Sequence, residues 1–267
     1  MNDSQPWQLA MFRRSLKKQQ KLRALLEMTG PLAGKQCLLI TCGDNNGALN
    51  WYFRERGGRW TWGDVEGENL PEMIDFLGEP VYQIRTDRFP FAAEAFDLVV
   101  AIDVLEHLDE DQPFLHELRR VMKPDGRALV TVPNGDPSLL ANRIKWRVGM
   151  TPEMYGHTRA GYTHAELEAA MRSAGFAPTE RGGYSRFVTE MLELAVNYGF
   201  VFVLSSRQRD KAVHDVPKAH IAPTSSGELK SHGAAYRLYA LGYPVMNALS
   251  KLDGLFPRHT DNAVIVA

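Results

Sequence analysis

The sequence predicts an α/β protein whose central sheet is parallel. Residues 98–102 form a short apolar run rich in β-branched side chains, which is the pattern of a strand buried on both faces. Apolar residues at helical spacing follow between positions 114 and 122, and a second buried run covers 128–132. A strand, a helix and a strand in this order predict two parallel strands joined by a right-handed crossover. Ligands bind beyond the carboxyl ends of such strands, so the polar segment 103–107 is expected to face a ligand cleft.

Length and composition suit one α/β core with additions. The chain has 267 residues and a formal net charge of -1, which gives no general reason to expect a nucleic-acid partner. Cys37 and Cys42 lack CxxC spacing and are expected to be reduced thiols. No apolar run reaches spanning length and no signal-peptide pattern is present, which predicts a cytoplasmic protein. No Ser-His-Asp set, metal-ligand spacing or GxxxxGK[ST] loop is found, so no metal is predicted.

The elements before the strand at 98–102 follow from periodicity. Residues 7–28 have a broad apolar side and a basic side, which predicts an amphipathic helix that ends at Gly30-Pro31. Such a helix either packs on its own domain with its charges in solvent or lies on an anionic membrane. Strands are predicted at 37–40, 60–62 and 81–84, with helices at 49–55 and from Asn69.

Two segments carry a family resemblance. FDLVVAIDVLEHL, followed by ELRRVMKPDGRALVTVPN, resembles the second half of a class I S-adenosylmethionine (SAM)-dependent methyltransferase. It is most similar to the small-molecule group that includes quinone-pathway methyltransferases. The resemblance implies a Rossmann-like, doubly wound sheet of seven strands, mostly parallel, with an antiparallel last strand. It also implies SAM as cofactor and a small molecule as methyl acceptor.

The resemblance assigns cofactor contacts to the loops after the strands. The family pattern after the first strand is an acid, one intervening residue and Gly-x-Gly; here Leu39 replaces the acid, Thr41 replaces the first glycine and Gly43 is retained. Asp64 or Glu66 follows the second strand; Asp64 matches the family position better and is expected to accept hydrogen bonds from the ribose hydroxyls, or else to cap the next helix. Asp87 is expected to meet the adenine amino group, or else to be a turn residue. The predicted cofactor-binding residues are Thr41, Gly43, Asp44, Asn45, Asp64, Val65, Asp87, Asp103, Val104 and His107.

The acceptor contacts are expected from a polar aromatic loop at residues 151–163. His157 titrates near neutral pH and is a candidate to take a proton from an acceptor hydroxyl, as is His107. Glu106 would then hold the other nitrogen of His107 or bind a cofactor group. Either histidine can instead make a purely structural hydrogen bond. The residues expected to orient the acceptor are Tyr155, Arg159 and Tyr162.

The last third of the chain departs from the family pattern. Residues 263–267 suit the seventh strand, so residues 184–260 form an insertion before it. The insertion has an apolar segment at 187–204, a polar stretch at 205–233 and a second helix at about 234–255 that contains Pro244. We expect its two apolar segments to pack together as a lid over the acceptor mouth; a dimer interface and a peripheral membrane contact are the alternatives. The predicted domains are a helical cover at 1–34, a core at 35–183 with 261–267, and the insertion at 184–260.

The predicted function is methyl transfer from SAM to a small lipophilic or glycosidic metabolite, with oxygen favoured over carbon or nitrogen as acceptor atom. One alternative is a non-catalytic, methyltransferase-like binding or scaffold protein, because Leu39 and Thr41 depart from the first motif. The other is an NAD(P)-dependent Rossmann oxidoreductase, which should show GxGxxG, a motif that this sequence lacks.

Overall fold

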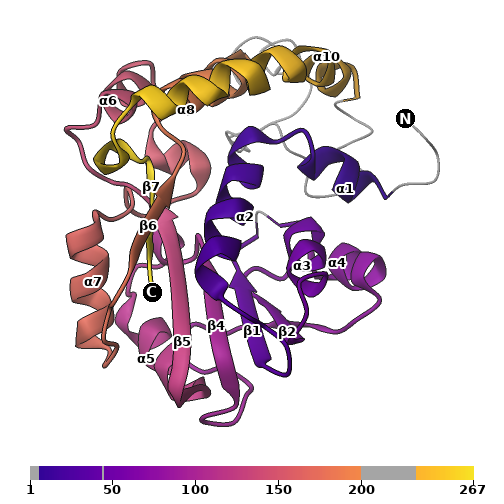
Figure 1. The fold of residues 1–267 in the computed structure, drawn as a ribbon, viewed down its shortest axis with the longest axis vertical. Coiled ribbons are helices and arrows are strands. Elements are labelled where there is room, and N and C mark those ends of the chain that lie inside the picture. The colour runs from indigo at the N-terminus through magenta and orange to yellow at the C-terminus, as the bar shows by residue number, and fades with distance from the viewer. Residues whose placement is uncertain (1–5, 44, 200–232) are drawn as a thin grey trace, which may run out of the picture.

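The computed structural model describes residues 6–43, 45–199 and 233–267 and contains a seven-stranded sheet (Figure 1). The strand order is β3-β2-β1-β4-β5-β7-β6. The first five strands pair in parallel, and β7 is antiparallel to both of its neighbours. This confirms the predicted mostly parallel sheet with an antiparallel last strand. The bounds are β1 Gln36–Thr41, β2 Arg59–Asp64, β3 Val81–Gln83, β4 Phe96–Ile102, β5 Met122–Pro133, β6 Arg181–Tyr184 and β7 Ala263–Val266.

Helices cover both faces of the sheet, which explains why its central strands are apolar on both sides. On one face, α5 and α7 pack through side chains such as Phe114 and Leu167. On the other face, α2, α3 and α4 contribute Leu25, Phe53 and Met73. All five of these side chains have 0 % exposure, so each face carries its own core layer. The helix bounds are α2 Leu16–Thr29, α3 Ala48–Arg54, α4 Leu70–Leu77, α5 Gln112–Val121 and α7 His164–Ser173.

The predicted helix at 7–28 is two helices, α1 Trp7–Phe12 and α2 Leu16–Thr29. Ser15 has extended backbone angles (φ −102°, ψ 109°) and separates them. Phe12 packs its ring on Tyr52 of α3, with centroids 4.8 Å apart, whereas Leu25 packs on the sheet. The prediction of one continuous helix was therefore wrong: the break lets each half bury its own apolar side.

The insertion forms a layer above the carboxyl ends of the strands. It contains α8 Phe187–Tyr198, α10 Gly233–Ser250 and the 3-10 turn η5 Lys251–Leu255, and α10 lies along α8 (Figure 1). Pro244 lies inside α10. Residues 200–204 of the expected apolar segment lie outside the described residues, as does the expected polar stretch at 205–233 except for Gly233. Between β5 and α7 the chain adds α6 Leu140–Arg147 and the 3-10 turn η2 Pro152–Tyr155.

Candidate active site

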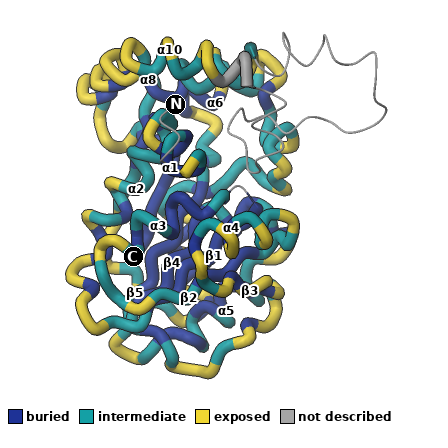
Figure 2. Tube along the Cα trace, turned by 90° about the vertical axis from the view of Figure 1, so that its right-hand side faces the viewer, coloured by how far each residue is buried: buried dark blue, intermediate teal, exposed yellow. Residues whose placement is uncertain are grey.

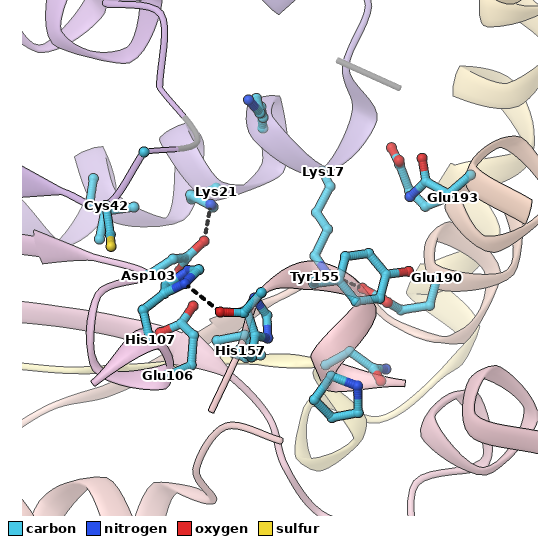
Figure 3. A pocket seen from close by; sticks show the side chains of 18 of the residues that line it. Lys17, Lys21, Cys42, Asp103, Glu106, His107, Tyr155, His157, Glu190 and Glu193 are labelled. Carbon is cyan, nitrogen blue, oxygen red and sulfur yellow. Dashed lines mark hydrogen bonds and ion pairs between the residues drawn. The ribbon is translucent and has the colours of Figure 1, made fainter. Parts of the chain in front are cut away.

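A cavity of about 280 Å³ lies at the carboxyl ends of β1 and β4. The loops that follow β1, β4 and β5 line its lower side, and α2, α6 and α8 line its upper side. Titratable side chains from these elements point into it (Figure 3). We refer to the two sides of this space as the cofactor wall, built by residues 41–66, and the acceptor wall, built by α2, α6, α8 and the loop at 151–160.

The cofactor wall is organised around the buried carboxylate of Asp64. This group accepts hydrogen bonds from the Thr41 hydroxyl (2.5 Å) and from the backbone amides of Gly43 (3.0 Å) and Glu66 (2.9 Å). It thereby fixes the loop after β1 to the loop after β2. Thr41, which replaces a family glycine, has a clear local role as one of these three donors. Burial raises the pKa of Asp64 to about 6, although the three donors oppose the rise.

Glu66, rather than Asp64, presents its carboxylate to the cavity. Gly43 has a φ of +68°, and a Cβ at this position would lie 2.0 Å from the Glu66 carboxylate oxygen. Only glycine therefore leaves room for this approach. Both acids follow the second strand, and the family pattern favours Asp64 for the ribose contact. Asp64 is the last residue of β2, whose end is buried against β1, and it does not line the cavity.

Asp103 holds α2 over the cavity. Its backbone has a positive φ of 50°, and its carboxylate accepts a hydrogen bond from Lys21 of α2 (Figure 3). The same carboxylate accepts a second hydrogen bond from the Thr131 hydroxyl. Burial alone would raise the pKa of Asp103, but the Lys21 charge outweighs it and lowers this pKa. The ion pair therefore joins the end of β4 to the N-terminal helix.

Three proton-accepting side chains converge beside Asp103. Glu106 is fully buried, and neither of its carboxyl oxygens has a hydrogen-bond partner among the described residues. Burial, and then the charge of Asp103, raise the pKa of Glu106 well above its usual value. The His107 and His157 rings meet edge to face, with centroids 4.8 Å apart. One donor atom from each of Glu106, His107 and His157 lies within 4.8 Å of the other two, an arrangement that can take up a proton or hold a divalent transition metal.

Backbone contacts fix this group of three. His107 Nδ1 lies 3.1 Å from the Gly156 carbonyl oxygen, so a neutral His107 ring carries its proton on Nδ1 and leaves Nε2 as an acceptor. The sequence predicts that Glu106 holds the second nitrogen of His107 or binds a cofactor group. In the structure Nδ1 pairs with Gly156, and the Glu106 oxygens have no hydrogen-bond partner among the described residues. The Thr158 amide donates to the Glu106 carbonyl oxygen at 2.8 Å. These two contacts clamp the His157 loop onto the end of β4.

A buried ion cluster closes the acceptor wall. The Glu190 carboxylate of α8, 3 % exposed, lies 2.9 Å from Lys17 of α2 and 2.9 Å from Lys145 of α6. Burial would raise the pKa of Glu190, but the two lysines outweigh it and lower this pKa to about 2. Glu193 lies one turn further along α8, lines the same cavity and has one carboxyl oxygen without a partner among the described residues. Sequence reasoning missed this cluster because its members are far apart in the chain and belong to no motif.

The structure brings about half of the predicted site residues to the cavity. Those that line it are Thr41, Gly43, Asn45, Asp103, His107, Tyr155 and His157. The others that it describes do not line it: Asp64, Val65, Asp87, Val104, Arg159 and Tyr162. Asp44 lies outside the described residues. Their functional roles stay predictions.

Three of the residues outside the cavity have other partners. Asp87 forms an exposed ion pair with Arg85 at 2.9 Å. The Tyr162 hydroxyl donates to Asp111 at 2.6 Å, and Arg159 bonds both of them. The contacts of Arg159 and Tyr162 with Asp111 join the loop before α7 to the start of α5.

Comparison with known proteins agrees with the fold. Residues 38–130 match the methyltransferase domain family. A ubiquinone biosynthesis O-methyltransferase from Bordetella avium is 22% identical over 207 residues, which cover 70% of this chain and 81% of that protein. A Haloferax volcanii methyltransferase, solved with the Trm112 methyltransferase activator, has a TM-score of 0.54 at 16% identity and covers 96% of this chain and 90% of its own. Haemonchus contortus phosphoethanolamine N-methyltransferase 2 has a TM-score of 0.55 at 17% identity, and the match covers 92% of this chain and 52% of that protein.

The strand order and the cavity at the strand ends, together with these similarities, define a class I methyltransferase. The chain is a SAM-dependent methyltransferase, and SAM is its cofactor. These comparisons favour the enzyme over the scaffold and oxidoreductase alternatives.

The residues of the cavity fit SAM. Gly43 allows close backbone approach, and Glu66 offers carboxylate oxygens suited to two ribose hydroxyls. Lys21 and Asp103 provide opposite charges beside the end of β4, which match the carboxylate and ammonium of an amino-acid group.

Proposed function

We propose that this enzyme methylates a hydroxyl oxygen on a small, lipophilic or glycosidic acceptor. The observation that carries the proposal is the convergence of Glu106, His107 and His157 beside the end of β4. A hydroxyl must lose its proton as its oxygen is methylated, so an O-methyltransferase benefits from a proton acceptor at this place. The Bordetella avium relative is named as an O-methyltransferase, which agrees with this choice of acceptor atom.

In this proposal His157 accepts the proton from the acceptor hydroxyl. Glu106 lies beside the resulting imidazolium, whose positive charge favours the ionised form of this buried carboxyl group. The ionised Glu106 in turn stabilises the imidazolium. His107, held by Gly156, orients the acceptor through Nε2 or takes the proton in its place. Bound SAM supplies the activated methyl group, so the protein's remaining task is to align the acceptor and exclude water.

The cofactor wall divides its work between two acids. We assign the ribose contact to Glu66, because its carboxylate faces the cavity. Asp64 then acts indirectly, since its three hydrogen bonds hold Thr41, Gly43 and Glu66 in place. Predicted contacts of Thr41 and Asn45 with the cofactor are compatible with their place in the lining.

The acceptor wall favours an acceptor that carries hydroxyl groups. Glu190, Glu193 and Asn197 lie at helical spacing on α8, and all three line the cavity, as does Tyr155. The buried Glu193 oxygen without a partner suits a hydroxyl donor from the acceptor, because a buried polar atom left unpaired costs free energy. The insertion would thus form the lid and bind the polar part of the acceptor.

The test is the identity of the methylated atom. Purified enzyme is incubated with SAM that carries a ¹³C-labelled methyl group and with a panel of phenolic, catecholic and glycosidic alcohols and matched amines. We expect product signals in the O-methyl region of the ¹³C spectrum. Product signals only in the N-methyl or C-methyl regions would contradict the choice of oxygen, and SAM binding by calorimetry confirms that the protein is loaded.

A further inference from the structure

The outer side of α10 and η5 carries an exposed apolar stripe. Leu238 is 72 % exposed, Leu241 78 % and Leu255 81 %, values unusual for leucines of a folded helix. The spacing of three or four residues places such side chains on one side of the helix. Figure 2 shows exposed and partly exposed segments along α10 at the top of the molecule. The stripe consists of Leu238, Leu241, Val245, Leu249, Leu252 and Leu255.

The inner side of α10 already has its partners. The Tyr239 hydroxyl donates to the carbonyl oxygen of Arg14, and Gln19 of α2 donates to the Tyr243 hydroxyl at 2.5 Å. α10 also packs along α8. Its position is therefore set from the inside, and the stripe is not needed to attach the helix to the protein.

The charges beside the stripe have one sign. Between residues 237 and 259, the exposed charged side chains are Arg237, Lys251 and Arg258. The one acid in this range, Asp253, is buried and accepts hydrogen bonds from the amides of Arg186 and Val188. Within residues 237–259 the apolar stripe is thus flanked by exposed cations, which matches a surface that is apolar inside and anionic at its edge.

A second copy of the chain matches this surface poorly. In a two-fold contact the same patch faces itself, so cations at the ends of the stripe would approach cations without an acid between them. A membrane-spanning role is also unsuited, because no helix among the described residues is long and apolar enough to cross a bilayer.

We propose that α10 and η5 dock on the surface of an anionic phospholipid bilayer, with the stripe in the boundary between head groups and acyl chains. Arg237, Lys251 and Arg258 then lie at the level of the anionic head groups. The inner side of α10 is bonded to α2, and α2 lines the cavity, so the docked enzyme holds its cavity next to the lipid surface. An acceptor with a lipid tail could then present its polar part without leaving the membrane.

Vesicle co-flotation of the full chain tests this proposal. The probes are vesicles of phosphatidylcholine alone and of phosphatidylcholine mixed with phosphatidylglycerol. We expect binding to the mixed vesicles, and at least about tenfold weaker partitioning for the triple variant Leu238→Gln, Leu241→Gln, Leu255→Gln. Glutamine removes the apolar surface and keeps helix propensity. The absence of wild-type binding to the mixed vesicles would overturn the proposal, as would an equal partition of the triple variant.

Matched variants separate docking from other causes. Ile74→Gln with Leu140→Gln changes exposed apolar residues elsewhere and should bind the vesicles like the wild type. Arg237→Glu with Lys251→Glu should lose the preference for the mixed vesicles. SAM affinity, measured by calorimetry, should be unchanged in all variants, which shows that they are folded and makes the result independent of the proposed acceptor. If light scattering shows a dimer that the triple variant dissociates, the stripe is a subunit interface and the proposal fails.

Discussion

The two walls of the cavity are held together in different ways. The cofactor wall is local: Asp64 gathers donors from residues 41–66, and two of the three are backbone amides. The acceptor wall is assembled from distant segments, and ion pairs such as Glu190 with Lys17 and Lys145 join them. A wall held by backbone contacts keeps its shape whatever the insertion does. A wall held by charges depends on every partner being present, so single substitutions should separate the two walls.

The largest effect is expected from Glu190→Ala, which leaves Lys17 and Lys145 without their shared partner. Removing one member of a buried ion cluster should lower the free energy of unfolding by about 3–5 kcal/mol. Urea denaturation measures this change. Glu180→Ala, which removes the exposed pair with Arg127, is the matched control and should cost no more than about 1 kcal/mol. Equal costs for the two variants would show that charge does not hold the acceptor wall.

The next largest expected difference between the two walls is in how the free energy of unfolding depends on pH. The folded-state pKa of Asp64 is about 6, above the usual unfolded value, so the folded protein holds this proton more tightly. The stability contributed by that proton is present at about pH 4 and is lost as pH rises to about 6, by up to about 3 kcal/mol. The difference in unfolding free energy between wild type and Asp64→Asn, measured from pH 4 to 7, should show this fall.

Glu190 should behave in the opposite way. Its folded-state pKa is lowered to about 2, so its contribution is present above about pH 4.5 and is lost only as pH falls toward 2. The corresponding difference for Glu190→Gln should therefore be flat between pH 5 and 7. A slope there would mean that the lysines do not keep this carboxylate ionised.

A substitution in the acceptor wall that removes the proposed proton acceptor should lower turnover without changing cofactor binding. His157→Ala is expected to lower kcat by at least about 100-fold, or about 2.7 kcal/mol, because it removes the proposed proton acceptor. SAM affinity, measured by calorimetry, should not change. The exposed His116→Ala is the control. Turnover that survives in both His157→Ala and His107→Ala would show that alignment alone drives the reaction, and loss of wild-type turnover with a chelator would assign the cluster to a metal instead.

The smallest effect concerns the ribose contact. Glu66→Gln should weaken SAM binding about tenfold, or about 1.5 kcal/mol, because it loses a charged hydrogen-bond acceptor. Glu68→Gln, an exposed neighbour, should bind SAM normally. If Asp64→Asn weakens binding and Glu66→Gln does not, the ribose contact belongs to Asp64, as the family pattern suggested.

Local pattern predicted the sheet well and the cavity only in part. Residues 98–102 and 128–132 indicated buried parallel strands, because a strand covered on both faces has to be apolar throughout. The choice between Asp64 and Glu66 depends on which way a side chain turns at a strand end, and spacing alone does not fix that. The cluster around Glu190 joins positions 17, 145 and 190, so no local signal exists for it. The break at Ser15 likewise reflects two separate packing surfaces rather than a helix-breaking residue.

The position of β7 between β5 and β6 sets how freely the insertion can change. The insertion leaves the sheet at Tyr184 of β6 and returns to it at Ala263 of β7. These two residues are paired across adjacent antiparallel strands, so the insertion connects them as a loop connects the strands of a hairpin. The entropy cost of closing a flexible loop grows only logarithmically with length, by about 0.6 kcal/mol for each doubling. Segments of very different size could therefore be exchanged at this junction while the cofactor wall stays as it is, which makes the junction a natural place to graft new acceptor specificities.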